Sequence, residues 1–311
     1  MTTPKICMVG SSMVDLISRI PRFPGPGPGE TVHGTAFHLG YGGKGSNQAV
    51  MAARLGAQVS VVVKLGRDVF GEGTAKNYRE QGIDDTYVMF DDERFSGVAP
   101  ITVDEETGQN AIIVIMGANF GLTPAEVRNA RPAIWAADVV MCQLEIPIES
   151  SLEAFRVAKE RHDPITTIMN PAPAAALPRE LLQITDILVP NEVETAMLSG
   201  MSVSTVDECI AAAKALQRQG PRSVILTLGE RGALVLEGDE PPHHVTAPRV
   251  QAVDTTGAGD AFVGSLAYFL AAGKPMVEAA QRAVAIASRS VLKIGTQTSF
   301  PYRDEVAELL T

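Results

Sequence analysis

The stretch that decides the fold is Asp254-Thr-Thr-Gly-Ala-Gly-Asp260-Ala-Phe-Val-Gly264. An apolar run at 250–253 precedes it and a helical run to about residue 272 follows, so the pattern predicts a strand, a glycine turn and a helix. Glycine lets a ligand approach bare backbone, and amides at a helix N-terminus favour an anion. Asp260 would repel a bound phosphate unless it acts as a base on a neutral hydroxyl. The stretch therefore predicts phosphoryl transfer to a hydroxyl group.

Two other interpretations of this stretch are a dinucleotide-binding turn and a plain helix start. A dinucleotide fingerprint requires G-x-G-x-x-G, and Phe262 stands where the third glycine should be. The second alternative is a plain helix start in which Asp260 is only a first-turn charge. The full length of the string favours the phosphoryl-transfer interpretation.

A second motif, Gly40-Tyr-Gly-Gly-Lys-Gly-Ser-Asn47, precedes a helical run at 48–55. It is not a Walker loop, because His38 and Gly45 occupy positions that need glycine and serine or threonine. Lys44 and Asn47 offer directional donors, which suit polyol recognition in a largely preformed site. The alternative is a flexible turn with a solvated lysine.

Together the two motifs resemble the ribokinase family of carbohydrate kinases, also called the PfkB family. Further segments match in the family's order: Gly117-Ala-Asn119, Gln143-Leu-Glu145, Asn170-Pro-Ala-Pro173, Asn191-x-x-Glu194 and Thr227-Leu-Gly229. The resemblance implies an α/β fold, with a three-layer α/β/α core, a mainly parallel central sheet and a small β-sheet lid. It implies one domain over 1–311, with the core at about 1–15, 40–94 and 118–311 and the lid at about 16–39 and 96–116.

The hydrophobic pattern agrees with that fold. Short apolar strands alternate with amphipathic helices, which implies a sheet covered on both faces. The expected strands are 6–9, 59–63, 139–142, 166–169, 187–189, 224–227 and 233–236. The expected helices are 46–55, 71–81, 123–130, 150–160, 206–219, 258–272 and 276–292. A proline- and glycine-rich turn at 24–29 and alternating runs within 96–116 predict hairpin strands that leave the core.

Composition excludes several classes of protein. The 311 residues carry a net charge of −10 with 45% apolar residues, which argues against nucleic acid or an acidic membrane as a partner. Three scattered cysteines, Cys7, Cys142 and Cys209, are expected to be buried thiols in a reducing cytosol. Neither a signal peptide nor an apolar run of the ~20 residues needed to span a membrane is apparent, so a cytoplasmic location is expected.

The resemblance also assigns roles to residues. Asp260 corresponds to the catalytic base, and Gly257, Ala258 and Gly259 to an anion hole for the transferring phosphoryl group. The positions that correspond to sugar contacts are Asp15, Gly43, Lys44, Asn47, Glu145 and Asp260. The positions that correspond to nucleotide contacts are Asn191, Glu194, Thr227, Gly229, Gly257 and Gly259.

Two of these assignments have structural alternatives. Glu194 is expected to organise Mg²⁺, largely through water, because Mg²⁺ retains several waters in protein sites. Asn191 and Glu194 also have the spacing of a helix capping box, and both roles can hold together. For Glu145, the alternative is an exposed acid at the end of a strand.

The resemblance further implies a monovalent-cation site beside the anion hole. Asp254 and Thr256 match its first half. Backbone carbonyls near Ser290, Lys293 and Gly295 and the hydroxyl of Ser299 would complete it. A weakly hydrated ion such as K⁺ suits a site of mostly neutral carbonyl oxygens. The alternative for Ser299 is a turn that resembles an N-cap before Pro301.

The implied reaction is ATP-dependent phosphorylation of D-ribose at its 5-hydroxyl, with Mg²⁺ and K⁺, in a homodimer that associates through the lid. One alternative is a kinase of another sugar or nucleoside, such as deoxyribose, fructose or a nucleoside. Another is a non-catalytic, sugar-binding regulatory protein. Many bacterial members of the family carry asparagine where this chain has Met13, which loosens the assignment to ribose.

Overall fold

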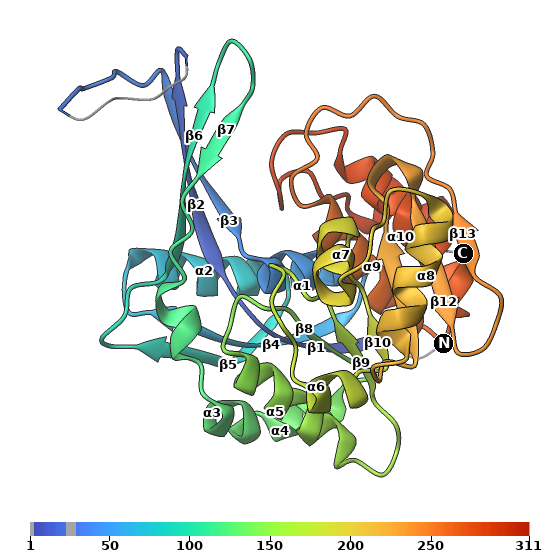
Figure 1. The fold of residues 1–311 in the computed structure, drawn as a ribbon. Coiled ribbons are helices and arrows are strands. Elements are labelled where there is room, and N and C mark those ends of the chain that lie inside the picture. Colours follow the sequence, from blue (N-terminus) through green and yellow to red (C-terminus); the bar gives the residue numbers. More distant parts are fainter. Residues whose placement is uncertain (1–2, 23–28, 311) are drawn as a thin grey trace.

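A nine-stranded sheet forms the middle layer of the protein in this computed structural model, which describes residues 3–22 and 29–310 (Figure 1). The strand order is β13-β12-β11-β10-β9-β8-β1-β4-β5, and only β12 and β13 at one edge run antiparallel to their neighbours. The strands are β1 (Lys5–Val9), β4 (Gln58–Gly66), β5 (Asp84–Asp91), β8 (Val139–Cys142), β9 (Thr166–Met169), β10 (Ile187–Leu188), β11 (Ser223–Thr227), β12 (Ala233–Glu237) and β13 (His243–Val245).

Helices cover both faces of this sheet. One face carries α1 (Lys44–Arg54), α2 (Val69–Glu80), α9 (Ala258–Ala271) and α10 (Met276–Ser290). The other carries α3 (Pro124–Asn129), α4 (Arg131–Ala136), α5 (Ile148–Lys159), α6 (Arg179–Gln183), α7 (Glu192–Ser199) and α8 (Val206–Gln217). Within β1, Met8 packs toward the first set of helices and Cys7 toward the second, because successive side chains alternate across a sheet. This arrangement confirms the expected three-layer α/β/α fold.

A small second sheet rises from the core like a blade (Figure 1). Its order is β3-β2-β6-β7, formed by β2 (Met13–Ile20), β3 (Ala36–Gly42), β6 (Gly97–Asp104) and β7 (Asn110–Ile112). The central pair, β2 and β6, is parallel, and the outer pairs are antiparallel. The turn expected at 24–29 lies, apart from Gly29, outside the described residues.

The four chain crossings between the two sheets meet around Ser12. The side chain of Asn119, in the 3₁₀ helix η1 (Gly117–Gly121), accepts a hydrogen bond from the Ser12 amide at 2.9 Å. Its Nδ2 donates to the carbonyl oxygens of Ser12 and Met116, both at 2.8 Å. A methyl group added at Gly97 would lie 2.3 Å from that Nδ2, and one at Gly43 would lie 2.7 Å from the Met13 nitrogen. The backbone crossings are therefore packed closely around the Asn119 side chain, and Gly43 and Gly97 leave no room for a side chain of their own.

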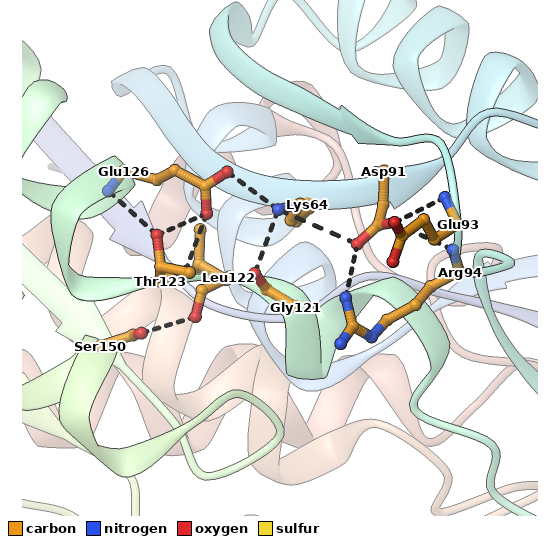
Figure 2. A network of polar contacts seen from close by, with 9 residues as sticks. All are labelled: Lys64, Asp91, Glu93, Arg94, Gly121, Leu122, Thr123, Glu126 and Ser150. Carbon is orange, nitrogen blue, oxygen red and sulfur yellow. Dashed lines mark hydrogen bonds and ion pairs between the residues drawn. The ribbon is translucent and has the colours of Figure 1, made fainter.

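A polar network links η1 to β4, β5 and α3 (Figure 2). Lys64 of β4 donates to Glu126 at 2.9 Å and to the Gly121 carbonyl at 3.1 Å, and lies 3.8 Å from the buried Asp91 carboxylate. Arg94 binds the same Asp91 oxygen at 3.1 Å. Hydrogen bonds from Arg94 and Glu93, together with Lys64, hold the pKa of Asp91 below its usual range despite burial.

The expected strands and helices are all present within a few residues except one. Residues 250–253 are not a strand: Val250 and Val253 are 42% and 61% exposed and pair with no strand of the sheet. β13 is the edge strand of the sheet, and this apolar run does not pair with it. Val250 and Ala252 line a cavity instead. The pattern did not predict β5, β13, α4, α6 or α7, nor the 3₁₀ helices η1, η2 (Gly229–Arg231) and η3 (Arg303–Leu309).

The cysteines fit the expectation of buried thiols. Cys7, Cys142 and Cys209 are all buried and unpaired, and burial raises the pKa of Cys7 to about 12. Across 3–22 and 29–310, no helix combines the length and apolar character needed to cross a bilayer.

Candidate active site

The predicted site residues gather at the carboxyl ends of the parallel strands. Glu145 follows β8, Asn170 follows β9, Asn191 follows β10, and Thr227 ends β11. The N-termini of α1 and α9, which pack against each other, reach the same edge. Open α/β sheets bind ligands at this edge because the loops and helix N-termini there face outward together.

The turn at the start of α9 forms the floor of a cavity of about 210 Å³. Gly257 is the N-cap, with φ of +77°, and a methyl group there would lie 2.5 Å from the Thr296 side chain. At Gly259, by contrast, an added methyl group would meet no protein atom within 4 Å. The absence of a side chain at Gly259 therefore leaves open space beside the turn, where a ligand could approach the backbone.

Asp260, in the first turn of α9, is 8% exposed and faces that cavity. Its Oδ2 accepts a hydrogen bond from Asn47 Nδ2 at 2.9 Å, and its Oδ1 accepts one from Gln48 Nε2 at 3.0 Å. A carboxylate has about four acceptor positions, so two remain for a substrate hydroxyl. Asn47 was predicted to belong to this site, whereas Gln48 was not.

The Lys44 side chain lies among acidic groups. Burial alone would lower the pKa of its ammonium, but three neighbouring carboxylates outweigh burial and raise that pKa. They belong to Asp260, Glu145 and Glu194. Burial raises the pKa of Asp15 to about 6, and the charges of Glu145 and Asp260 add to the shift. The structure therefore brings Lys44 and the four predicted acids into one electrostatic cluster.

Glu145 anchors the N-terminus of α1. Its Oε2 accepts the Lys44 backbone N–H at 2.8 Å and the Ser11 hydroxyl at 2.5 Å. At 8% exposure it is buried, so the alternative of an exposed acid at a strand end is wrong. Gly43, the residue before α1, has φ of +86°, a backbone conformation that favours glycine.

Asn191 and Glu194 form the capping box of α7. Asn191 Oδ1 accepts the Glu194 amide at 2.8 Å, and Glu194 Oε2 accepts the Asn191 amide at 2.8 Å. Glu194 also lines the cavity beside Lys44, and burial raises its pKa. Glu194 therefore caps α7 and also lines the cavity. Among the described residues, no group of three or more histidine, cysteine, aspartate or glutamate side chains is placed to hold a metal.

A second cavity of about 810 Å³ adjoins the first and shares Thr227 and Gly259 with it. Gly229, predicted to be a nucleotide contact, also lines it. Its apolar walls come from α9, from α10 and from the run 247–252 that does not form a strand. These walls were not predicted from the sequence, where the apolar run before the glycine turn was taken for a strand.

The residues matched to a monovalent-cation site come together only in part. Asp254 Oδ1 accepts the backbone N–H and the hydroxyl of Thr256, and Oδ2 accepts the Gly295 amide at 2.9 Å. Ser290 and Ser299 are buried, and each donates its hydroxyl to a backbone carbonyl nearby in its own segment. The Lys293 ammonium binds Glu305 at 2.8 Å, so only its carbonyl is relevant to such a site.

Comparison with known proteins identifies the family. A family model described as pfkB family carbohydrate kinase matches residues 3–303. The chain belongs to the pfkB family of carbohydrate kinases. Ribokinase of Mus musculus is 41% identical over 305 residues, which cover 97% of this pfkB chain and 93% of that protein. A deoxyribokinase of Salmonella typhi is 40% identical over 307 residues, covering 98% of each chain.

Solved structures agree with this membership. The structure of Arabidopsis thaliana ribokinase complexed with ribose and ATP has a TM-score of 0.93 to this pfkB chain. It shares 31% sequence identity, and the match covers 99% of each chain. The fold is therefore the ribokinase fold, and the protein is a carbohydrate kinase.

Proposed function

We propose that this protein transfers the γ-phosphoryl group of ATP to the 5-hydroxyl of D-ribose. The observation that carries the proposal is the position of Asp260. Its carboxylate lies on the first turn of α9, next to the open face of Gly259, in a cavity that also contains Lys44 and Glu194. A base and an anion-binding turn are thus adjacent, as in-line transfer from a phosphate to a hydroxyl needs.

In this proposal Asp260 accepts the proton of the sugar hydroxyl as it attacks phosphorus. The backbone amides of Gly257, Ala258 and Gly259 stabilise the charge on the transferring phosphoryl group, where preorganised donors have most effect. Asp15, Gly43, Lys44, Asn47 and Glu145 are the proposed sugar contacts. Ionised carboxylates suit a polyol because each accepts several hydrogen bonds.

The nucleotide is proposed to bind across both cavities. The smaller one, with Asn191 and Glu194, takes the phosphates, and the larger one, edged by Thr227 and Gly229, takes the base and ribose. Lys44 is outnumbered by carboxylates in this site, so a polyanion needs an accompanying cation. Mg²⁺, bound by the phosphates and by Glu194 through water, would neutralise part of the phosphate charge.

The test is a coupled ADP-release assay with ribose, 2-deoxyribose, fructose and nucleosides. Deoxyribose is the second candidate, because a relative named deoxyribokinase is as similar to this chain as the ribokinases are, and because buried Met13 offers no amide to a hydroxyl. We expect kcat/KM to be highest for ribose. A tenfold higher value for deoxyribose or another acceptor would overturn the ribose assignment. Lack of ADP release with every acceptor would favour a non-catalytic, sugar-binding role.

We also propose K⁺ activation through Asp254. An ion held by Asp254, Thr256, Ser299 and carbonyls of Ser290, Lys293 and Gly295 would fix the segment that positions the Gly257 turn. Misplacing catalytic groups by about 1 Å can cost ~100-fold in rate. Activity should rise with K⁺ at constant ionic strength and much less with Na⁺. Asp254→Asn should weaken that response, whereas equal rates in K⁺, Na⁺ and Tris buffer would remove the site.

A homodimer is proposed through the small sheet, acting as a lid. Paired residues in a sheet share a face, so Leu16 and Leu39 lie on the side opposite to Asp15. Phe37 on that side is 62% exposed, and Leu39 is 49% exposed. An exposed apolar sheet face of this kind is suited to association. Light scattering at micromolar concentration should give twice the chain mass; a fully active monomer would contradict the proposal.

A further inference from the structure

The Asp260 carboxylate is held by two chains of buried amide side chains, one ending on each of its oxygens. Gln48 donates directly to its Oδ1, and Asn47 donates directly to its Oδ2. Neither Gln48 nor the residues that hold it were expected to take part in the site.

The first chain fixes the orientation of the Gln48 amide. Gln48 Oε1 accepts a hydrogen bond from Gln143 Nε2 at 2.6 Å, so the Nε2 of Gln48 points the other way, toward Asn170 and Asp260. That Nε2 donates to Asn170 Oδ1 at 3.0 Å as well as to Asp260 at 3.0 Å. Asn170 in turn donates to the Val189 carbonyl at 2.8 Å. Both hydrogens of the Gln48 amide are therefore committed, and the group cannot rotate without losing bonds.

The second chain supports Asn47. Gln297 Nε2 donates to Asn47 Oδ1 at 3.2 Å, and Gln297 Oε1 accepts from Asn77 Nδ2 at 3.1 Å. The Gln297 carbonyl is held by Arg54 at 2.6 Å. This chain crosses three elements that are distant in sequence, so its geometry depends on the packed core.

We propose that Gln48 is a positioning residue for phosphoryl transfer, holding the Asp260 carboxylate in the orientation from which it takes the hydroxyl proton. The inference rests on the proposed role of Asp260 as the base. Gln48 is 0% exposed, so it has no access to a ligand in the cavity and acts through the two cavity-lining residues that it binds, Asp260 and Asn170. A neutral amide orients a carboxylate while withdrawing less of its basicity than a lysine or arginine in the same place would.

Two substitutions test the proposal. Gln48→Met keeps side-chain length but removes both donors, and we expect kcat to fall about 10- to 100-fold while the KM for the sugar stays within about threefold. Gln48→Glu keeps the oxygen that Gln143 binds but puts a second carboxylate beside Asp260. Two adjacent carboxylates tend to share a proton, so the introduced group should donate to Asp260 only at lower pH. The activity of Gln48→Glu, expressed as a ratio to that of wild type at the same pH, should therefore rise as pH falls from 8 to 6.

The matched control is Gln217→Met in α8. Gln217 also donates two hydrogen bonds, to the carbonyls of Arg222 and Gly238, but lies outside the site. It should lower the melting temperature without changing kcat. For Gln48→Met, a folded protein with kcat within twofold of wild type would overturn the proposal, as would a loss confined to KM. If Gln48→Met does not fold, the pH profile of Gln48→Glu decides, and a profile of wild-type shape overturns the proposal.

Failure of the positioning role and failure of the proposed function give different results with Asp260→Asn and Gln48→Met. Asp260→Asn should be almost inactive. If Asp260→Asn is inactive and Gln48→Met is fully active, the positioning role is wrong and the proposed function stands. If Asp260→Asn retains activity, the base is misassigned and the positioning role is wrong with it.

Discussion

Two glycines of the same turn should respond in opposite ways to alanine. At Gly259, the added methyl group meets no protein atom within 4 Å, and it points to the side where the phosphoryl group is proposed to lie. At Gly257, the methyl group would lie 2.5 Å from Thr296 Cγ2 and 3.3 Å from the Phe300 ring, on a residue whose φ is +77°. The first substitution should harm activity and the second should harm stability.

The magnitudes follow from these environments. Gly259→Ala removes the flexibility of a helical glycine, which stabilises a helix by about 0.5–1 kcal/mol. Gly257→Ala forces alanine into a left-handed conformation at about 1–2 kcal/mol and adds overpacking of about 1–3 kcal/mol. Obstructing or displacing one donor of an anion hole costs about 10²- to 10³-fold in kcat. We therefore expect Gly259→Ala to melt no lower than wild type while losing at least about 100-fold in kcat.

The assay combines thermal melting with steady-state kinetics at varied ATP. Gly273→Ala is the control, because Gly273 follows the other end of α9 with φ of +80° and no atom near its added methyl group. It should lose stability through the backbone alone and keep full kcat. Unchanged kcat and kcat/KM for ATP in Gly259→Ala would refute the placement of the phosphoryl group at this turn. So would a large loss of stability in that variant.

Three further outcomes are expected. Asp260→Asn should lower kcat by ~10²- to 10⁴-fold, measured by ADP release, since it removes the proposed base and retains its shape; a change of only a few fold would point to a different base. The pKa of the Asp15 carboxyl is raised to about 6, so protonation should stop it from accepting sugar hydroxyls as pH falls through 6. The kcat/KM for the sugar should therefore drop toward pH 5. Asp15→Asn should lose this acidic limb of the pH profile, and an unchanged limb would contradict the assignment. Lys64→Met should destabilise the protein by about 3 kcal/mol in urea melts at pH 7 by leaving the buried Asp91 less compensated. The pKa values of Asp91 and Glu126 are lowered in the folded state, so their ionised forms stabilise the fold at neutral pH, and that stabilisation is lost as pH falls below their usual ranges. The free energy of unfolding of Lys64→Met should therefore differ less from that of wild type at low pH. Equal stability of the two proteins at pH 7 would contradict this account.

Much of the fold could be predicted because the strands of the large sheet are buried on both faces. Such strands appear in sequence as short apolar runs between helices, and β8 and β9 were bounded to the residue. The same rule failed at 250–253, where apolar residues line a cavity and not a sheet. Apolar character alone does not distinguish the two environments. The parallel pairing of β2 with β6 was not predicted either, because register between distant strands is a tertiary property.

Some residues of the candidate site could be predicted from the sequence and others could not. Residues inside the two glycine motifs, such as Lys44 and Asn47, were found because turn chemistry is local. Gln48 and Gln297 were not, because what matters about them is a contact made across more than 200 positions of sequence. Periodicity places Gln48 on α1 as one more polar residue among apolar ones. Only the packing of α1 against α9 shows that its amide reaches Asp260.

The meeting of four chain crossings around Ser12 and Asn119 has a mechanical consequence for the small sheet. A body attached at one narrow point can turn about that point but cannot easily slide, because sliding would break all the Asn119 bonds together. Displacement in a rotation grows with distance from its axis. Asp15, three residues from Ser12, lies near the axis, whereas Ile20 lies five residues further along the strand, or about 16 Å. A rotation of the small sheet about Ser12 would therefore displace Ile20 more than twice as far as Asp15.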